Sequence, residues 1–185
     1  MNTSYVFLAE GFEEIEALTV VDVLRRAGMD VKTVSITPLR NVRGAHGIEV
    51  MVDELFTECD FGKAEWLICP GGLPGATNLA DCEPLGELLK SHHKGIAAIC
   101  AAPAVVLAPL GLVEGKPVTC YPGFEKACKI GGGEYQSDVA VVSSNDFITA
   151  AGPATALPFA LEIVKQTLGA AAADEVASGM LVNLL

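Results

Sequence analysis

Residues 96–111 read IAAICAAPAVVLAPLG, a short apolar run followed without a break by a longer one. The sequence predicts a strand at Ile96–Ile99 and a helix at Ala101–Leu110 that ends at Gly111. Cys100 lies at the junction, and the small residues on both sides of it permit the tight turn that joins a strand directly to a helix. The stretch therefore predicts a strand-helix unit with a thiol at a nucleophile elbow.

The rest of the chain repeats this alternation of strand and helix. Apolar runs, rather than alternating apolar and polar residues, indicate strands buried on both faces of a mostly parallel sheet. We therefore expect a single domain over residues 1–185 with a flavodoxin-like three-layer α/β sandwich. The other predicted strands are Tyr5–Ala9, Val31–Thr37, Ile48–Val52, Trp66–Cys69, Val118–Cys120, Val139–Ser143 and Phe147–Ala151. The other predicted helices are Leu18–Ala27, Leu85–His93, Ala156–Leu168 and Ala170–Leu181.

The composition excludes several classes of protein. Hydrophobic residues make up 51% of the 185 residues, which is enough for a large core. The formal net charge is -11, the wrong sign for holding nucleic acid or an anionic membrane surface. No apolar run approaches the roughly 18 residues needed to span a bilayer. No signal peptide is visible at the N-terminus, so we expect a cytoplasmic protein.

Six cysteines are present, and none forms a C-x-x-C pair or another metal-ligand spacing. We therefore expect no metal site, and buried thiols are the default interpretation. Cys100 is the exception, because the N-terminus of the following helix should favour its thiolate and lower its pKa. Cys120 is a candidate resolving thiol for Cys100. The others are interpreted as structural or incidental: Cys59, Cys69, Cys82 and Cys128.

Four carboxylates follow the first predicted strand, in the run EGFEEIE at residues 10–16. Most of these carboxylates are interpreted as solvated surface groups. A Glu in the first turn of the next helix can point over the strand ends toward Cys100. A carboxyl group buried beside a thiolate has a raised pKa, so it stays protonated and can move protons during covalent chemistry. The sequence pattern does not single out one Glu for this role.

A glycine-rich turn, CPGGLPG at residues 69–75, follows another predicted strand. Glycines let the backbone approach a ligand closely, and exposed N–H groups in such a turn can form an oxyanion hole. The competing interpretation is phosphate binding. Neither G-x-x-x-x-G-K-[ST] nor G-x-G-x-x-G is present, which disfavours the usual nucleotide folds.

Together the motifs GFEEIE, PGG, AICAAP and AAGPAT resemble the ThiJ/PfpI superfamily, in particular the branch of the Parkinson-associated deglycase. The resemblance covers most of the chain. It places the family's nucleophile on Cys100, its protonated glutamate on Glu16 and its backbone oxyanion donors on Gly72 and Ala101. It also implies a homodimer and cofactor-free thiol chemistry on small reactive carbonyls or glycated groups, as in glyoxalases and deglycases.

Two of the chain's departures from the family concern candidate substrate-binding residues. Tyr121 occupies the place of the family's His, and a phenol cannot replace a His base. It can contact a substrate or the thiolate, or pack under the loop. His46 aligns with a family arginine near the dimer-side pocket. We interpret Gly71, Tyr121 and His46 as substrate-binding candidates.

Two other functions would use the same cysteine. One is an oxidative-stress sensor or redox-regulated chaperone, in which Glu16 stabilises an oxidised sulfur on Cys100. The other is an intracellular cysteine peptidase. This function is disfavoured because it needs a His near Cys100, and the next residue is Ala101.

Overall fold

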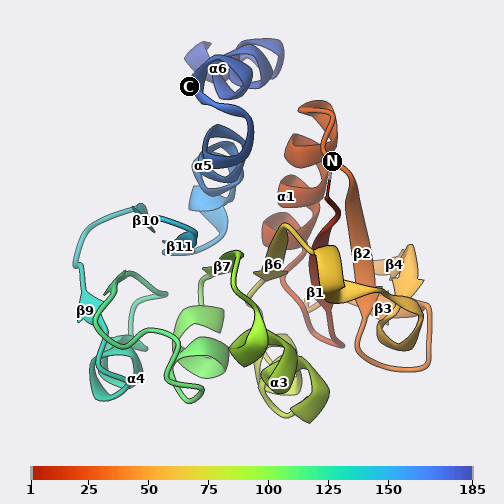
Figure 1. Cartoon of the computed structure of the whole chain (residues 1–185), viewed down its shortest axis with the longest axis vertical. Coiled ribbons are helices and arrows are strands. Elements are labelled where there is room, and N and C mark those ends of the chain that lie inside the picture. Colours follow the sequence, from red (N-terminus) through yellow and green to blue (C-terminus); the bar gives the residue numbers. More distant parts are fainter. Residues whose placement is uncertain (1, 185) are drawn as a thin grey trace.

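The computed structural model describes residues 2–184, in which seven strands form a central sheet (Figure 1). The strand order is β10-β11-β7-β6-β1-β2-β5, and all neighbours are parallel except β10 and β11. This architecture confirms the predicted α/β fold with a mostly parallel sheet. The strands are β1 (Ser4–Leu8), β2 (Val31–Ser35), β5 (Glu54–Leu55), β6 (Trp66–Cys69), β7 (Gly95–Ile99), β10 (Val141–Ser144) and β11 (Phe147–Ala150).

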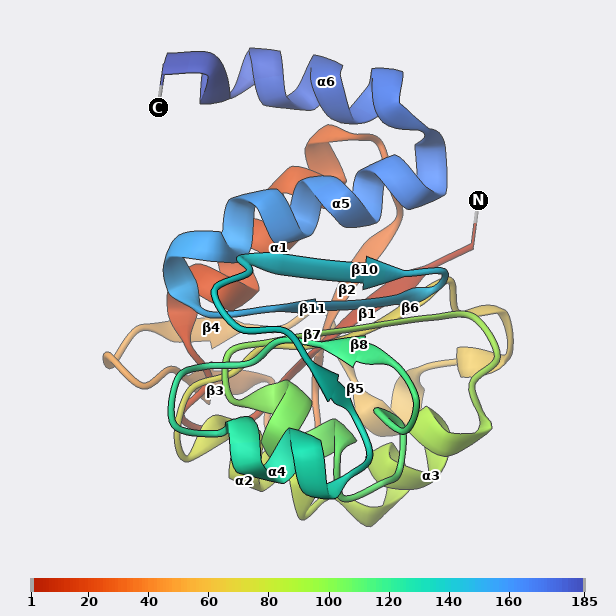
Figure 2. The same ribbon diagram turned by 90° about the vertical axis from the view of Figure 1, so that its left-hand side faces the viewer.

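Helices cover both faces of the sheet, as Figure 2 shows. On one face lie α1 (Glu14–Arg26), α5 (Ala156–Leu168) and α6 (Ala170–Gly179), with α5 in contact with both of the others. On the other face lie α2 (Gly75–Ala80), α3 (Glu83–Ser91) and α4 (Glu125–Ile130). Among residues 2–184, no helix combines the length and apolar character that a membrane crossing requires.

Two small ladders lie outside the central sheet. The antiparallel pair is β3 (Asn41–Arg43) with β4 (Glu49–Met51), and the parallel pair is β8 (Pro117–Val118) with β9 (Glu134–Tyr135). These four strands and the helices α2 and α4 are too short to show a hydrophobic period, so the sequence predicted only β4 and β8 among them.

The predicted helix at Ala101–Leu110 differs from the structure in its backbone. Pro103–Leu107 is π-helical, and the Ala108 N–H donates to the Pro103 carbonyl at 3.0 Å, five residues earlier. Pro109 has no N–H group, so it cannot continue a regular α-helical ladder. The apolar pattern predicted a helix but not this irregular form.

The centre of the sheet is buried. Every residue of β1, β6 and β7 is buried, and Phe7, Phe12 and Phe159 are among the largest side chains that solvent does not reach. Because these three strands are parallel neighbours, the loops that follow them emerge at one edge of the sheet. The sheet therefore brings Cys100, the glycine-rich turn and the acidic run together.

Candidate active site

Cys100 follows β7 in a left-handed conformation, with φ of 65°. A non-glycine residue in this region costs roughly 1–2 kcal/mol, so the surroundings must hold it there. Its N–H donates to the Ala150 carbonyl at 2.9 Å, and its own carbonyl accepts from the Tyr121 N–H at 2.8 Å. The side chain is 8% exposed. This geometry is that of the predicted elbow.

Glu16 reaches the same place from the first turn of α1. Glu13 caps this helix, and its Oε2 accepts from the Glu16 N–H at 2.7 Å. The Glu16 side chain is fully buried, and its Oε2 accepts from the Gly71 N–H at 2.8 Å. Its carboxyl group is also hydrogen-bonded to the Cys100 thiol. The structure thus selects one Glu from the acidic run as the neighbour of the cysteine.

Burial raises the pKa of Glu16 to about 7, and the negative charge of Glu13 adds to this shift. The hydrogen bonds with Cys100 and with the Gly71 N–H act in the opposite direction, because they favour the carboxylate. Burial wins, so Glu16 changes its protonation state near neutral pH. This property suits a group that takes up and returns protons.

The pKa of Cys100 is raised to about 12, mainly by burial and next by the negative charge of Glu16. The N–H groups of Gly72 and Ala101 lower the pKa of the thiol, but by less. The prediction of a lowered pKa is therefore wrong. The start of the following helix lowers the pKa of the thiol only through these two N–H groups. Their effect is smaller than the combined effect of burial and of the nearby Glu16 carboxylate, which both raise the pKa.

The two groups titrate as a pair, because each changes the pKa of the other. One proton leaves the pair near pH 7, mainly from Glu16, and the remaining proton lies on Sγ of Cys100, whose pKa is raised to about 12. Moving it from sulfur to Glu16 creates a thiolate without changing the net charge. That thiolate has the N–H groups of Gly72 and Ala101 as donors, at the positions predicted for the oxyanion site.

The glycines of the second loop allow the loops to pack together. A Cβ atom on Gly71 would lie 2.7 Å from Cβ of Cys100 and 2.8 Å from Oε2 of Glu16. Gly72 has φ of +87°, and a Cβ atom on it would lie 2.5 Å from the backbone N of Glu13. The close approach expected for a ligand is thus made by the protein's own backbone. Whether Gly71 also contacts substrate stays a prediction.

Glu16→Gln should increase the stability of the protein more at pH 8 than at pH 4.5. The folded-state pKa of Glu16 is about 7 against an unfolded value of 4.5, so the stability provided by the protonated form is lost as pH rises through 7. A shift of this size corresponds to about 3 kcal/mol. Urea unfolding of both proteins at the two pH values measures it, and a difference that does not change with pH would contradict the buried carboxyl state.

The other two substrate-binding candidates, Tyr121 and His46, lie on separate segments of the chain. Tyr121 is 45% exposed, and its ring lies beside Gly152, whose Cβ position is 3.1 Å from the ring. The ring is therefore not packed under the loop. His46 lies between β3 and β4, where its ring is paired with Glu14. Their contacts with substrate stay predictions.

Within residues 2–184, one group of side chains brings three potential metal-ligand atoms within 4.8 Å of one another: Glu13, Glu14 and His46. Nδ1 of His46 lies 2.8 Å from Oε2 of Glu14, and the backbone N–H of His46 donates to Oε1 of Glu14 at 2.7 Å. The hydrogen bond and charge of Glu14 raise the pKa of His46. His46 and Glu14 thus form a hydrogen-bonded pair, which becomes an ion pair when the imidazole is protonated.

Sequence reasoning missed the role of Glu13. It caps α1, its charge contributes to the raised pKa of Glu16, and its N–H donates to the Gly71 carbonyl at 3.0 Å. The available signal was its position, because an acidic residue directly before an apolar helix is a common N-cap. Glu13 therefore positions both Glu16 and the glycine-rich turn.

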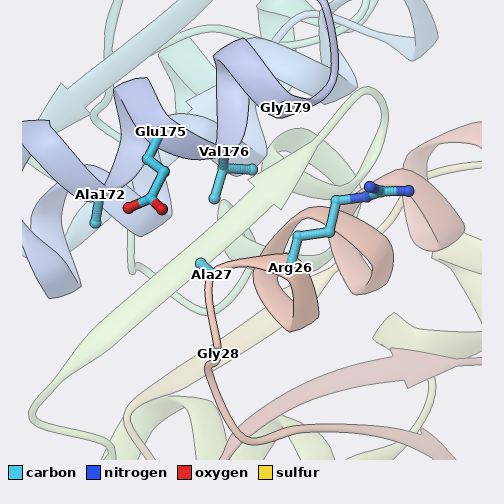
Figure 3. Close-up of a pocket in the computed structure, with 7 residues that line it drawn as sticks. All are labelled: Arg26, Ala27, Gly28, Ala172, Glu175, Val176 and Gly179. Carbon is cyan, nitrogen blue, oxygen red and sulfur yellow. The ribbon is translucent and has the colours of Figure 1, made fainter.

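A cavity of about 560 Å³ lies away from this site, between the end of α1 and α6 (Figure 3). Because α1 runs back from the cysteine edge of the sheet, its C-terminal end lies at the opposite edge. Arg26, which lines the cavity, points away from it in the figure and is paired with Asp22 at 2.7 Å. The cavity thus contributes nothing to the site around Cys100.

In a comparison with known protein families, residues 3–166 match the DJ-1/PfpI family. The chain is 37% identical to protein dj-1beta of Drosophila melanogaster over 184 residues, which cover 98% of this chain and 97% of that protein. The crystal structure of Drosophila DJ-1beta superposes with a TM-score of 0.92 at 35% identity, covering 97% of each chain.

Two further relatives differ in length. The chain is 37% identical to protein DJ-1 homolog B of Arabidopsis thaliana over 95% of its own length, but it spans only 40% of that protein. It is 38% identical to a Caenorhabditis elegans protein named glutathione-independent glyoxalase DJR-1.2, over 86% of this chain and 85% of that one.

Proposed function

Because the chain belongs to the DJ-1/PfpI family, we propose that it is a cofactor-independent enzyme that converts reactive 2-oxoaldehydes into hydroxy acids. The observation that carries this proposal is the buried pair of Glu16 and Cys100, in which a carboxyl group with a pKa of about 7 contacts a cysteine at an elbow. The glyoxalase name of the nematode relative supports it. Glycated groups, which carry related carbonyl chemistry, are a second substrate class.

The first step proposed is attack of the Cys100 thiolate on the aldehyde carbon of methylglyoxal. Glu16 takes the thiol proton as the carbon–sulfur bond forms, which avoids a free thiolate in a buried site. The carbonyl electrons move to oxygen, and the N–H groups of Gly72 and Ala101 stabilise the developing charge. Protonation of that oxygen gives a hemithioacetal.

The second step moves a proton between the two adjacent carbons. Glu16, now able to act as a base, removes the hydrogen from the carbon bonded to sulfur and returns a proton to the neighbouring carbon. The result is a thioester of lactate on Cys100. Water then attacks the thioester, the carbon–sulfur bond breaks, and lactate leaves with the thiol restored. The sum is methylglyoxal plus water to lactate.

The test is lactate formation from methylglyoxal by the purified protein with a metal chelator and without glutathione. We expect steady turnover that stops when iodoacetamide alkylates Cys100. Absence of lactate with the unmodified protein would contradict the proposal.

A second candidate function is oxidative-stress sensing, alone or coupled to chaperone activity. It is favoured by one observation: Oε1 of Glu16 is buried without a hydrogen-bond partner among the described nitrogen and oxygen atoms. This oxygen can donate a hydrogen bond to an oxidised sulfur when it carries the proton. Peroxide treatment followed by intact mass should then give a sulfinate on Cys100 that Glu16→Gln makes less abundant.

We also propose that the protein forms a homodimer through the start of α1 and the β3–β4 hairpin. Exposed apolar side chains gather on these neighbouring elements, although such side chains are normally scattered: Ile15, Leu18, Ile48 and Met51. The Ala45 N–H donates to the Phe12 carbonyl at 2.8 Å and so fixes the hairpin beside the helix. Sedimentation equilibrium should give twice the chain mass, whereas a monomer would exclude the dimer.

A further inference from the structure

Two buried carboxylates lie beside an exposed imidazole where α1 begins. The side chains of Glu13 and Glu14 are only 9% and 6% exposed, whereas that of His46 is 70% exposed. Burying a charged group is costly unless a counter-charge or a metal ion compensates it. Among residues 2–184, His46 is the one basic side chain paired with either carboxylate. Two buried negative charges thus share a single imidazole.

One carboxylate oxygen of this group has no hydrogen bond. Oε2 of Glu13 accepts from the Glu16 N–H at 2.7 Å. In the described part of the chain, no nitrogen or oxygen atom donates to Oε1 of Glu13. This oxygen faces Nδ1 of His46 at 3.9 Å, which is beyond hydrogen-bond distance. It is therefore available to a cation that binds between the two side chains.

The protein holds both carboxylates in fixed positions. The backbone N–H of His46 donates to Oε1 of Glu14 at 2.7 Å, and that of Ile48 donates to the same oxygen at 3.4 Å. Gly44 packs so closely on the Glu14 carboxyl group that a Cβ atom there would clash with it. Glu13 is fixed as the cap of α1. Only the exposed ring of His46 is left free to move, so most of a ligand set is preorganised.

The spacing of the three side chains fits a zinc ion. With zinc–ligand distances of about 2.0–2.2 Å, two ligand atoms in tetrahedral coordination lie roughly 3.3–3.6 Å apart. Nδ1 of His46 lies 2.8 Å from Oε2 of Glu14 and 3.9 Å from Oε1 of Glu13, one value below this range and one above it. Movement of the His46 ring can therefore even out the two distances. An imidazole nitrogen favours zinc over calcium or magnesium, which prefer oxygen ligands.

We propose that Glu13, Glu14 and His46 form a binding site for a zinc-type divalent ion, with water at the fourth coordination position. The ion joins the start of α1 to the segment between β3 and β4 and compensates the two buried charges. The expectation of no metal site was drawn from the cysteine spacing, and this group contains no cysteine. The site goes beyond the carbonyl reaction proposed above, in which none of its three ligand atoms takes part.

Equilibrium dialysis against zinc chloride at neutral pH tests this proposal. Cys100→Ser is the starting protein, because a thiolate at the neighbouring active site could otherwise take the ion. We expect one zinc ion per chain, in a monomer and in a dimer alike. A protein that retains no zinc would overturn the proposal.

Further substitutions in this starting protein locate the ion. His46→Gln should weaken zinc binding by more than about 100-fold, since groups that merely orient a ligand already contribute about 10- to 100-fold. Glu13→Gln should also weaken it, while its amide oxygen can still cap α1. His93→Gln is the matched control, because His93 is an exposed histidine that follows α3, and its affinity should not change. Equal affinity in His46→Gln and His93→Gln would overturn the proposal.

His46→Arg separates zinc binding from charge compensation. The guanidinium gives the two carboxylates a permanent positive charge, but it cannot ligate zinc. Zinc should raise the unfolding temperature of the starting protein, because an ion that binds the folded state stabilises it. It should not raise that of the His46→Arg variant, and an equal rise in both would place the ion elsewhere and contradict the proposal. Because nothing is read through lactate, these outcomes do not depend on glyoxalase activity.

Discussion

Cys100→Ser should reduce lactate formation from methylglyoxal to the level of a reaction without protein. The Ser hydroxyl is a far weaker nucleophile than a thiol, and Glu16, with a pKa of about 7, is too weak a base to deprotonate it. The loss should exceed 10⁴-fold by order of magnitude, as for other nucleophiles that act with a base. Initial rates of lactate release, followed with lactate dehydrogenase, measure the effect.

Cys69→Ser is the matched control for this variant. Cys69 is a buried thiol at the end of the neighbouring strand β6, and burial alone raises its pKa to about 12. Replacing sulfur with oxygen at position 69 should leave turnover near the wild-type level. Turnover that survives in Cys100→Ser would reject covalent catalysis by this residue.

Glu16→Gln should lower kcat/KM for methylglyoxal by about 10²- to 10⁴-fold, the usual range for loss of a general acid–base. The amide keeps the size of the side chain but can neither take the thiol proton nor move one between carbons. It also removes the negative charge beside the Cys100 thiol. The midpoint for alkylation of Cys100 should therefore fall from about 12, because the negative charge of Glu16 raises the pKa of the thiol in the wild type.

The matched control for Glu16→Gln is Glu10→Gln, in the same acidic run. The Glu10 carboxylate is exposed and accepts from the Arg43 N–H at 3.1 Å, on the outer side of the loop. The alkylation profile against pH should match the wild type in this variant. A midpoint that stays near 12 in Glu16→Gln would show that the charge of Glu16 does not act on the thiol.

Most of the sheet could be predicted because its strands are long enough and apolar enough to stand out. Trp66–Cys69 and Ala156–Leu168 have the same bounds in the sequence prediction and in the structure. The strand predicted at Phe147–Ala151 also lies within one residue of β11, and the turn before it has Asn145 in the left-handed region at φ of 50°. In each case the signal is local, so no knowledge of distant residues is needed.

The electrostatics of the site could not be predicted in the same way. The sequence shows that a helix follows Cys100, but not that Glu16 lies against the sulfur with solvent excluded. The net direction of the Cys100 pKa depends on that long-range contact.

Tyr121 combines two separate functions in one residue. Its backbone N–H donates a hydrogen bond to the Cys100 carbonyl and so helps to fix the left-handed conformation of the elbow. Its ring is half exposed and takes no part in that hydrogen bond. Any residue except proline supplies the same N–H group. Evolution, or a saturation library at this position, can therefore exchange the side chain to tune substrate preference without dismantling the nucleophile.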